Sequence, residues 1–497
     1  MLKLIVFFVF LSGFVNGLRW NVFKAGGSLG SPHLRRHHKH LPPEQWFEQN
    51  LDHFNPIENG TWKQRYFTND QFYKPGGPVF LMIGGEVPIT NKWMVEGQWI
   101  EYAKQFNALC FQLEHRYYGK SHPTSDLGTK NLIYLNSEQA LADLASFIQA
   151  MNEKCGFSGA PKWIVFGCSY AGTLAAWVRE KYPHLVHGAV SSSAPLLAAV
   201  DFKEFYVVVK DSLATHSDKC VEAVKNGTKQ LEISMKHMIG MRSLDEKFRL
   251  CDPIESNVDN SLDISNLFEM LANNFGDIVQ YNKNNRMSKD GTSNITIDTL
   301  CDIMVNEAIG TLLDRLAEVN SLILNATDEK CLDYKYDNMI NKLRNTSWDS
   351  EMDEGGRQWM YQTCTQFGFF QTSSQSDKNN IFGKHFPVDF FIQKCKDIFG
   401  LRYSMDNLEK AVERTNIIYG ALNIPTTRIV FVHGSIDPWH ALGITKSMRK
   451  ESPAVYIKGT AHCANVYPAR DSDLPQLKQA RQFVGQLIKK WLNNNDS

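Results

Sequence analysis

Short apolar runs alternate with amphipathic segments in the first 200 residues of this sequence. The runs are almost continuously apolar, which is typical of strands buried on both faces of a parallel sheet. A segment between two of them instead has apolar residues at helical spacing and is followed by Gly156 as a stop. The predicted elements are strands at 79–83, 108–113 and 187–191, a strand that begins at Trp163, and a helix at 137–151. This alternation predicts a parallel α/β sheet.

The pattern becomes helical and amphipathic between about residues 199 and 405, with few segments that read as buried strands. We interpret this region as a large insertion between two strands of the sheet. Such an insertion is expected to lie over the carboxyl edge of the sheet as a helical cap that limits substrate size. The sheet pattern then resumes with a helix at 408–419, strands at 428–432 and 454–458, and a last helix with an apolar stripe of Leu477, Ala480, Val484, Leu487 and Trp491.

The strand that begins at Trp163 runs into the segment Gly167-Cys168-Ser169-Tyr170-Ala171-Gly172. A serine between small residues, on a sharp turn from a strand into a helix, is the nucleophile signature of α/β-hydrolases. Such a run also arises by chance in a chain of this length, but the flanking strand and amphipathic helix favour the chemical interpretation. We therefore predict that Ser169 is the nucleophile.

A nucleophilic serine needs a histidine to accept its proton and a carboxylate to orient that histidine. In α/β-hydrolases these partners follow the serine in the order acid, then histidine, each just after a strand. Asp437 follows the strand at 428–432, and His462 follows the strand at 454–458. His433 and His440 also lie near Asp437, but neither follows a separate strand, and we interpret them as structural. The predicted catalytic residues are therefore Ser169, Asp437 and His462.

Acyl transfer also requires hydrogen-bond donors for the developing oxyanion. The strand at 79–83 ends in Gly84-Gly85, at the place where α/β-hydrolases supply one of these donors. We predict the backbone amides of Gly85 and Tyr170 as the oxyanion hole. A simple glycine turn at the end of a buried strand explains the two glycines equally well.

The length and charge of the chain limit the classes of function that the sequence supports. The chain has 497 residues, with 53 basic and 53 acidic side chains, so no strong field favours nucleic acid or an anionic membrane. The apolar run from Leu4 to Val15 follows a lysine and is too short to span a bilayer, which predicts a signal peptide at 1–17. The predicted organisation continues with a mobile or removable segment at 18–45, hydrolase halves at 46–198 and 406–497, and a cap at 199–405.

Ten cysteines and several glycosylation sequons agree with a secreted or lysosomal protein. Six cysteines fall between the nucleophile and the acid, and we expect them to crosslink that region to itself: Cys220, Cys251, Cys301, Cys331, Cys364 and Cys395. Cys110 and Cys168 are expected to be buried free thiols. No cysteine spacing resembles a zinc site, so we expect no metal and no cofactor. The predicted glycosylation sites are Asn59, Asn226, Asn294, Asn325 and Asn345.

With these residues identified, nearly the whole mature chain resembles the prolyl-directed serine peptidases, the family of lysosomal Pro-X carboxypeptidase, dipeptidyl peptidase II and thymus-specific serine protease. The motifs that carry the resemblance are 46–47, 51–54, 64–66, 114–119, 167–172, 359, 362–365 and 437–439. The segment Ala461-His462-Cys463 is most similar to the thymus-specific branch. Cys168 departs from the family pattern, which commonly has glycine there.

The resemblance implies an α/β-hydrolase with a Ser169, Asp437 and His462 triad that cleaves peptides beside proline from one end. It also implies that Trp439 walls the proline pocket, and Glu86 is a candidate for substrate binding. We expect Glu114 to be a structural ion-pair partner. We expect the protein to bind peptide substrates, and the sequence does not decide whether it forms a homodimer. Two alternatives remain: a carboxylesterase or lipase on the same fold, and a non-catalytic binding protein.

Overall fold

An eight-stranded sheet forms the centre of the molecule, which is a computed structural model that describes residues 30–32, 34, 40–157, 159–283, 294–349 and 355–493. The predicted signal peptide and the basic part of the 18–45 segment lie outside these residues. The strands are β1 (Gln45–Asn50), β2 (Thr61–Asn69), β3 (Val79–Ile83), β4 (Leu109–Leu113), β5 (Trp163–Cys168), β6 (Val186–Ser192), β9 (Ile429–Gly434) and β10 (Ala454–Ile457). Their spatial order is β1-β2-β4-β3-β5-β6-β9-β10, which is the strand order of an α/β-hydrolase.

The sheet is mixed, whereas the sequence pattern predicted a parallel one. β1 pairs antiparallel with β2, and β2 pairs antiparallel with β4, while the remaining pairs are parallel. β1 and β2 were not predicted, because polar residues outnumber apolar ones in both and neither segment reads as a buried strand. β1 is the edge strand and β2 lies next to it, away from the ends of β5 and β9.

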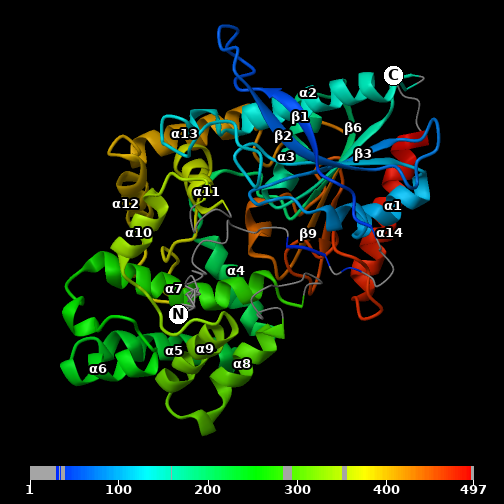
Figure 1. Cartoon of the computed structure of the whole chain (residues 1–497). Helices are drawn as coiled ribbons and strands as arrows, with labels where there is room; N and C mark the ends of the chain where they lie inside the picture. The colour runs from blue at the N-terminus through cyan, green and yellow to red at the C-terminus, as the bar shows by residue number, and fades with distance from the viewer. Residues whose placement is uncertain are drawn as a thin grey trace, which may run out of the picture.

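Helices cover both faces of the sheet (Figure 1). One face packs against α2 (Ser137–Cys155), α3 (Tyr170–Lys181) and α13 (Met405–Tyr419), and the other packs against α1 (Gln98–Phe106) and α14 (Pro475–Asn493). The helix predicted at 137–151 extends to Cys155. Gly156 then ends it in a left-handed backbone conformation, as expected. The predicted stripe on α14 packs against the core, with Leu487 half-buried and the other four residues buried, and Ile488 also lies in the core.

Most of the chain between β6 and β9 is helical. Helices α5 to α9 gather in the lower part of Figure 1, while the sheet lies in the upper part. The helices are α4 (Glu204–Ala214), α5 (Asp218–Ser234), α6 (Met238–Lys247), α7 (Ser261–Gln280), α8 (Ile297–Val305), α9 (Leu312–Ala326), α10 (Tyr336–Arg344), α11 (Gly356–Gln362) and α12 (Val388–Phe399). Two short strands, β7 (Ala199–Asp201) and β8 (Gly368–Phe370), pair in parallel beside them.

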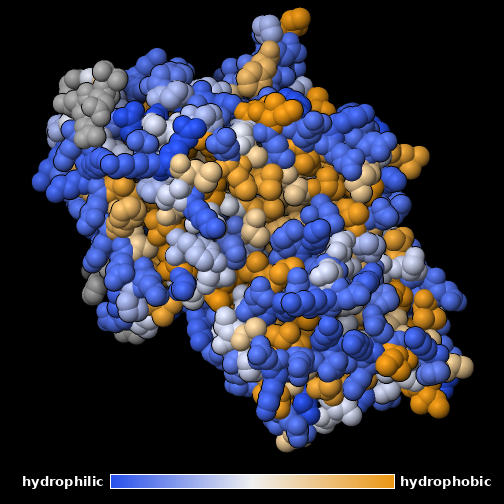
Figure 2. Space-filling view, turned by 180° about the vertical axis from the view of Figure 1, so that it is seen from behind, coloured by the Kyte–Doolittle hydropathy of each residue, from blue (hydrophilic) through white to orange (hydrophobic). Residues whose placement is uncertain are grey.

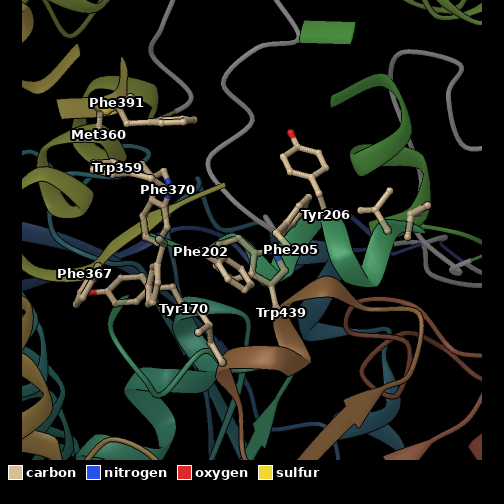
Figure 3. Packing of buried hydrophobic residues seen from close by; sticks show 14 of the residues in the cluster. Tyr170, Phe202, Phe205, Tyr206, Trp359, Met360, Phe367, Phe370, Phe391 and Trp439 are labelled. Atoms are coloured by element: carbon tan, nitrogen blue, oxygen red, sulfur yellow. The ribbon is translucent and has the colours of Figure 1, made fainter. Parts of the chain in front are cut away.

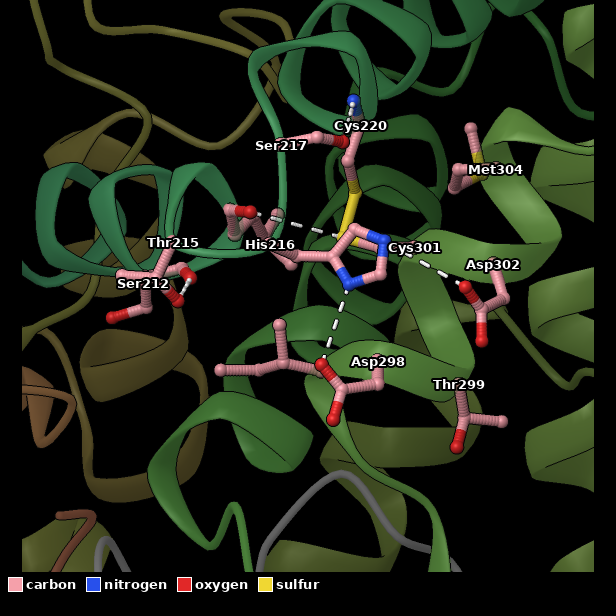
Figure 4. The surroundings of a disulfide bond; sticks show 12 residues. Ser212, Thr215, His216, Ser217, Cys220, Asp298, Thr299, Cys301, Asp302 and Met304 are labelled. Atoms are coloured by element: carbon pink, nitrogen blue, oxygen red, sulfur yellow. Dashed lines mark hydrogen bonds and ion pairs between the residues drawn. A yellow bond between two sulfur atoms is a disulfide. The ribbon is translucent and has the colours of Figure 1, made fainter. Parts of the chain in front are cut away.

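Three disulfides crosslink this inserted region to itself, which confirms the expectation for its six cysteines. The pairs are Cys220–Cys301, Cys251–Cys331 and Cys364–Cys395. Figure 4 shows the first pair joining α5 to α8, with His216 beside it between Asp298 and Asp302. Since each bond closes a loop within the insertion, the region is held together independently of the sheet.

The surface seen in Figure 2 is mostly hydrophilic, with apolar residues gathered near its middle. Within the described ranges, no helix combines the length and the apolar character that crossing a bilayer requires. The five asparagines of the predicted glycosylation sites are all exposed.

A buried ion pair joins β2 to the loop after β4. The Arg65 guanidinium donates to both carboxylate oxygens of Glu114, at 3.1 Å and 2.5 Å, and also contacts the exposed Glu44. The Glu114 carboxylate accepts further bonds from the backbone amides of Ile89 and Lys120. Glu114 therefore has the structural role that we expected.

Replacing Glu114 by glutamine should destabilise the protein, because it leaves the Arg65 charge buried with only the peripheral Glu44 as a partner. We expect the free energy of unfolding to fall by about 3 kcal/mol, measured by denaturant unfolding. The control is Glu101→Gln, which breaks the exposed pair between Glu101 and Lys104 and should cost less than about 0.5 kcal/mol. Equal effects of the two substitutions would contradict this interpretation.

Candidate active site

Ser169 lies on a sharp turn between β5 and α3. Its backbone has φ of 60° and ψ of −134°, a conformation that only a tightly constrained turn imposes on a residue other than glycine. A side-chain carbon at Gly167 would stand 2.0 Å from the Ala171 carbonyl oxygen, and one at Gly172 would stand 2.6 Å from the Ser192 carbonyl oxygen. The two glycines are therefore required for the close approach of strand and helix, as the sequence pattern predicted.

Asp437 and His462 form a buried pair. The Nδ1 atom of His462 lies 2.8 Å from Oδ1 of Asp437, and the same oxygen accepts a bond from the Trp439 amide at 3.0 Å. Burial alone would raise the pKa of Asp437, but His462, His433 and the Ser193 hydroxyl outweigh it and hold that pKa below its usual value. Asp437 is consequently ionised and can orient the imidazole.

The two alternative histidines have other partners. Nδ1 of His440 lies 2.6 Å from the main-chain oxygen of Asp437, not from its carboxylate. His433 is buried beside Gly443, and burial lowers its pKa to about 4, so its ring is neutral. His462 is therefore the histidine that the structure brings to the Asp437 carboxylate.

The end of β6 connects the serine turn to the histidine loop. The Ser169 amide donates to the Ser192 carbonyl at 3.0 Å, and the Cys463 amide donates to the Ser193 hydroxyl at 2.9 Å. The side chain of Asn465 also donates to the Ser192 hydroxyl at 2.8 Å. The serine turn and the histidine loop, which are far apart in sequence, are thus both held by the adjacent residues Ser192 and Ser193. This connection was not predicted, because Ser192 and Ser193 resemble any polar strand end.

A disulfide joins Cys168 to Cys463, so the expectation that Cys168 is a free thiol is wrong. The reason is spatial, since the loop after β10 places Cys463 beside the end of β5. Cys110 is buried and free, as expected. A ring nitrogen of His462 lies within 4.8 Å of both sulfur atoms, the one such cluster of metal-ligating side chains in the described part of the chain. Sulfurs bonded to each other are not thiolates, so this cluster is no zinc site.

The predicted oxyanion-hole residues lie together. A side-chain carbon at Gly85 would stand 3.3 Å from the Ala171 methyl group, so the loop after β3 packs against the first turn of α3. Tyr170 is the first residue of α3, where a backbone amide has no acceptor within the helix. The Tyr170 hydroxyl is held by Gln362 at 3.0 Å and lies 3.2 Å from His115. The contact of Gln362 was not predicted, because only its place in a family motif distinguishes this residue.

Glu86 lies beside the nucleophile in a fully buried position. Burial raises its pKa to about 8, although a hydrogen bond with the Ser169 side chain opposes this shift. Its Oε1 atom has no hydrogen-bond partner. Glu86 therefore carries a proton at neutral pH and has one polar atom available to a bound molecule.

Trp439 lies in an aromatic cluster next to the pair of Asp437 and His462. Its ring centroid is 5.3 Å from that of Phe202 and 5.6 Å from that of Phe369, and Figure 3 shows Phe202 and Phe205 beside it. Its indole nitrogen donates to the side chain of Gln280 at 3.0 Å, and the His462 amide donates to the main-chain oxygen of Gln280 at 2.9 Å. Gln280, at the end of α7, thus connects the inserted region to the site. The role of Gln280 was not predicted, because nothing in an amphipathic helix indicates such a contact.

Comparisons with known proteins agree with this geometry. A family model described as serine carboxypeptidase S28 matches residues 49–484. The thymus-specific serine protease of Mus musculus is 35% identical over 467 residues, which cover 91% of this chain and 88% of that protein. The protein of the same name in Homo sapiens is 32% identical and covers 91% of this chain and 87% of its own. The lysosomal Pro-X carboxypeptidase of Homo sapiens is 27% identical, covering 94% and 93%.

The raised pKa of Glu86 predicts that the free energy of unfolding depends on pH. The ordinary carboxyl pKa is 4.5 and the folded value is about 8, so the folded state binds the proton more tightly than the unfolded chain does. The contribution of Glu86 to the free energy of unfolding is therefore fully present below pH 4.5, where the carboxyl group is protonated in both states. It falls as the pH rises towards 8, because only the unfolded chain then loses the proton. The neutral variant Glu86→Gln should lose this dependence. Relative to wild type, its stability should increase by up to about 1.4 kcal/mol per pH unit across that window.

Thermal unfolding of both proteins at a series of pH values measures this difference. Glu48→Gln, at an exposed position of β1, serves as the control and should follow the wild-type curve. If the Glu86→Gln curve also runs parallel to wild type between pH 5 and 8, Glu86 is already ionised in the folded protein.

Proposed function

This chain belongs to the serine carboxypeptidase S28 family of serine peptidases, and we propose that it is an exopeptidase that cleaves short peptides beside proline. The observation that carries the proposal is the arrangement of Ser169 on the turn after β5 and His462 on Asp437. The reaction proceeds through an acyl-enzyme on Ser169.

The hydrogen bonds assign the roles of the three residues. Since Nδ1–H of His462 donates a hydrogen bond to the Asp437 carboxylate, Nε2 is the basic nitrogen that accepts the proton of the Ser169 hydroxyl. The serine oxygen attacks the peptide carbonyl, and the backbone amides of Gly85 and Tyr170 stabilise the resulting oxyanion. His462 then gives the proton to the leaving amine, and water releases the acyl group by the same steps in reverse order.

Burial of the site supports cleavage near a chain end. Ser169 is 2% exposed, and His462 and Asp437 are 0% exposed. The inserted region closes the site through Gln280, which bonds both to His462 and to Trp439. A folded protein has no access to such a site, whereas the end of a short peptide can enter it. The structure supports an exopeptidase, and the carboxypeptidase and dipeptidyl peptidase alternatives both fit.

The aromatic cluster supports a preference for proline. The flat indole of Trp439 lies between Phe202, Phe369 and His462, next to the reacting groups. A pyrrolidine ring buries its apolar face well against such a surface. We propose Trp439 as the wall of this pocket and Glu86, with its available oxygen, as a second contact to substrate.

The proposed setting is the secretory pathway or the lysosomal lumen. The four disulfides within the described residues require an oxidising compartment during folding. The exposed sequon asparagines are proposed glycosylation sites.

Esterase activity is the second candidate function, because the turn and the triad alone do not distinguish an ester from an amide. A non-catalytic binding role fits poorly, since all three triad residues are retained.

Ser169→Ala should reduce the hydrolysis of short proline-containing peptides by at least about a thousandfold, because no other group can form the acyl-enzyme. It should also abolish covalent labelling by a fluorophosphonate probe. His440→Ala is the control for His462→Ala: it removes a neighbouring imidazole that does not contact the Asp437 carboxylate, and its activity should stay within a few-fold of wild type. Full labelling of Ser169→Ala would refute the assignment.

Trp439→Leu should lower the preference for proline, because leucine lacks the flat surface that packs on the ring. We expect the ratio of kcat/KM for a peptide with proline to that for the same peptide with alanine to fall about tenfold. Trp177→Leu removes an equally buried indole that stacks on Tyr419, away from the site, and should leave the ratio unchanged. Mass spectrometry of a cleaved peptide library gives the ratio and identifies the end that is attacked. A comparison with simple aryl esters tests the esterase alternative.

A further inference from the structure

We propose that the disulfide between Cys168 and Cys463 is a positioning element that holds the Ser169 turn and the His462 loop in their reacting arrangement. This inference rests on the proposed roles of Ser169 and His462. Each cysteine is the direct chain neighbour of one of these residues, on the strand side of Ser169 and on the far side of His462. The bond therefore acts on the relative position of nucleophile and base.

The connectivity of this bond differs from that of the other three. Those three pairs each close a loop inside the inserted region, with sequence separations of 81, 80 and 31 residues. Cys168 and Cys463 are 295 residues apart, and their bond joins the two halves of the sheet across the whole insertion. Their Cα atoms are 5.9 Å apart, a usual separation for a disulfide.

The base needs such a connection more than the nucleophile does. Ser169 follows β5, which is flanked by β3 and β6 and is buried along its whole length. His462 follows β10, the edge strand, which is four residues long, pairs with β9 alone and is only partly buried. The disulfide ties the loop after this edge strand directly to the end of β5, bypassing β6 and β9.

The bond also lies against the base itself. Both sulfur atoms are within 4.8 Å of a ring nitrogen of His462, and Cys463 has a left-handed backbone with φ of 60°. Proton transfer between serine and histidine depends on their separation, and a displacement of about 1 Å is enough to slow a reaction about a hundredfold. The disulfide touches no reacting atom, so its role is to position and not to react.

Removal of the bond tests the proposal. In the double variant Cys168→Ala/Cys463→Ala we expect kcat to fall at least about tenfold, with KM within about twofold of wild type, because the substrate pocket remains while the two reacting side chains lose their fixed separation. The rate of fluorophosphonate labelling should fall by the same factor, and its final extent, which counts folded active sites, should be unchanged. Cys110→Ala is the matched control, since it removes a buried unpaired sulfur from the same apolar cluster and should alter neither kcat nor KM.

A role in stability alone would give another pattern. The melting temperature would then fall while kcat and the labelling rate per active site stay at wild-type values, and this result would overturn the proposal. If the double variant does not fold, peptide mapping of the wild-type protein without reduction decides: a linked pair of peptides that contain Cys168 and Cys463 is expected, and free thiols at both positions would overturn it. A wild-type protein that is not labelled at all contradicts the proposed function instead.

Discussion

The register of hydrogen bonds between parallel strands is the constraint on which the site depends. Cys168, Ser192, Val432 and Val455 are successive partners across β5, β6, β9 and β10, so the carboxyl ends of these strands lie in one row. Ser169, Ser193, Asp437 and His462 all follow that row. A slip of any strand by one residue would turn its side chains to the opposite face and separate nucleophile from base.

The carboxyl groups of Glu114, Asp437 and Glu86 are all buried, and the surroundings of each stabilise it in a different way. Arg65 neutralises Glu114, and His462 with the neighbouring donors keeps Asp437 ionised. Glu86 has no cationic partner and holds a proton instead. Two of these buried carboxyl groups are thus ionised and the third is protonated, as the groups within hydrogen-bonding distance of each determine.

The sequence predicted the parts of the molecule that local patterns encode. The buried strands, the turn at Ser169 and the order of acid and base are visible because apolar runs and small residues are local signals. The strands β1 and β2, the partner of Cys168 and the contacts of Gln280 were not predicted. Each of these depends on which distant segment lies alongside, and neither spacing nor composition records that information in a single sequence.

The contact of Gln280 with both His462 and Trp439 bears on how such enzymes diversify. An inserted region that accepts a hydrogen bond from the His462 amide cannot be exchanged as a free-standing module, because a replacement would have to present an acceptor at the same place. New specificities on this scaffold are therefore expected to arise through gradual changes in the lining of the pocket, with the end of α7 kept in place.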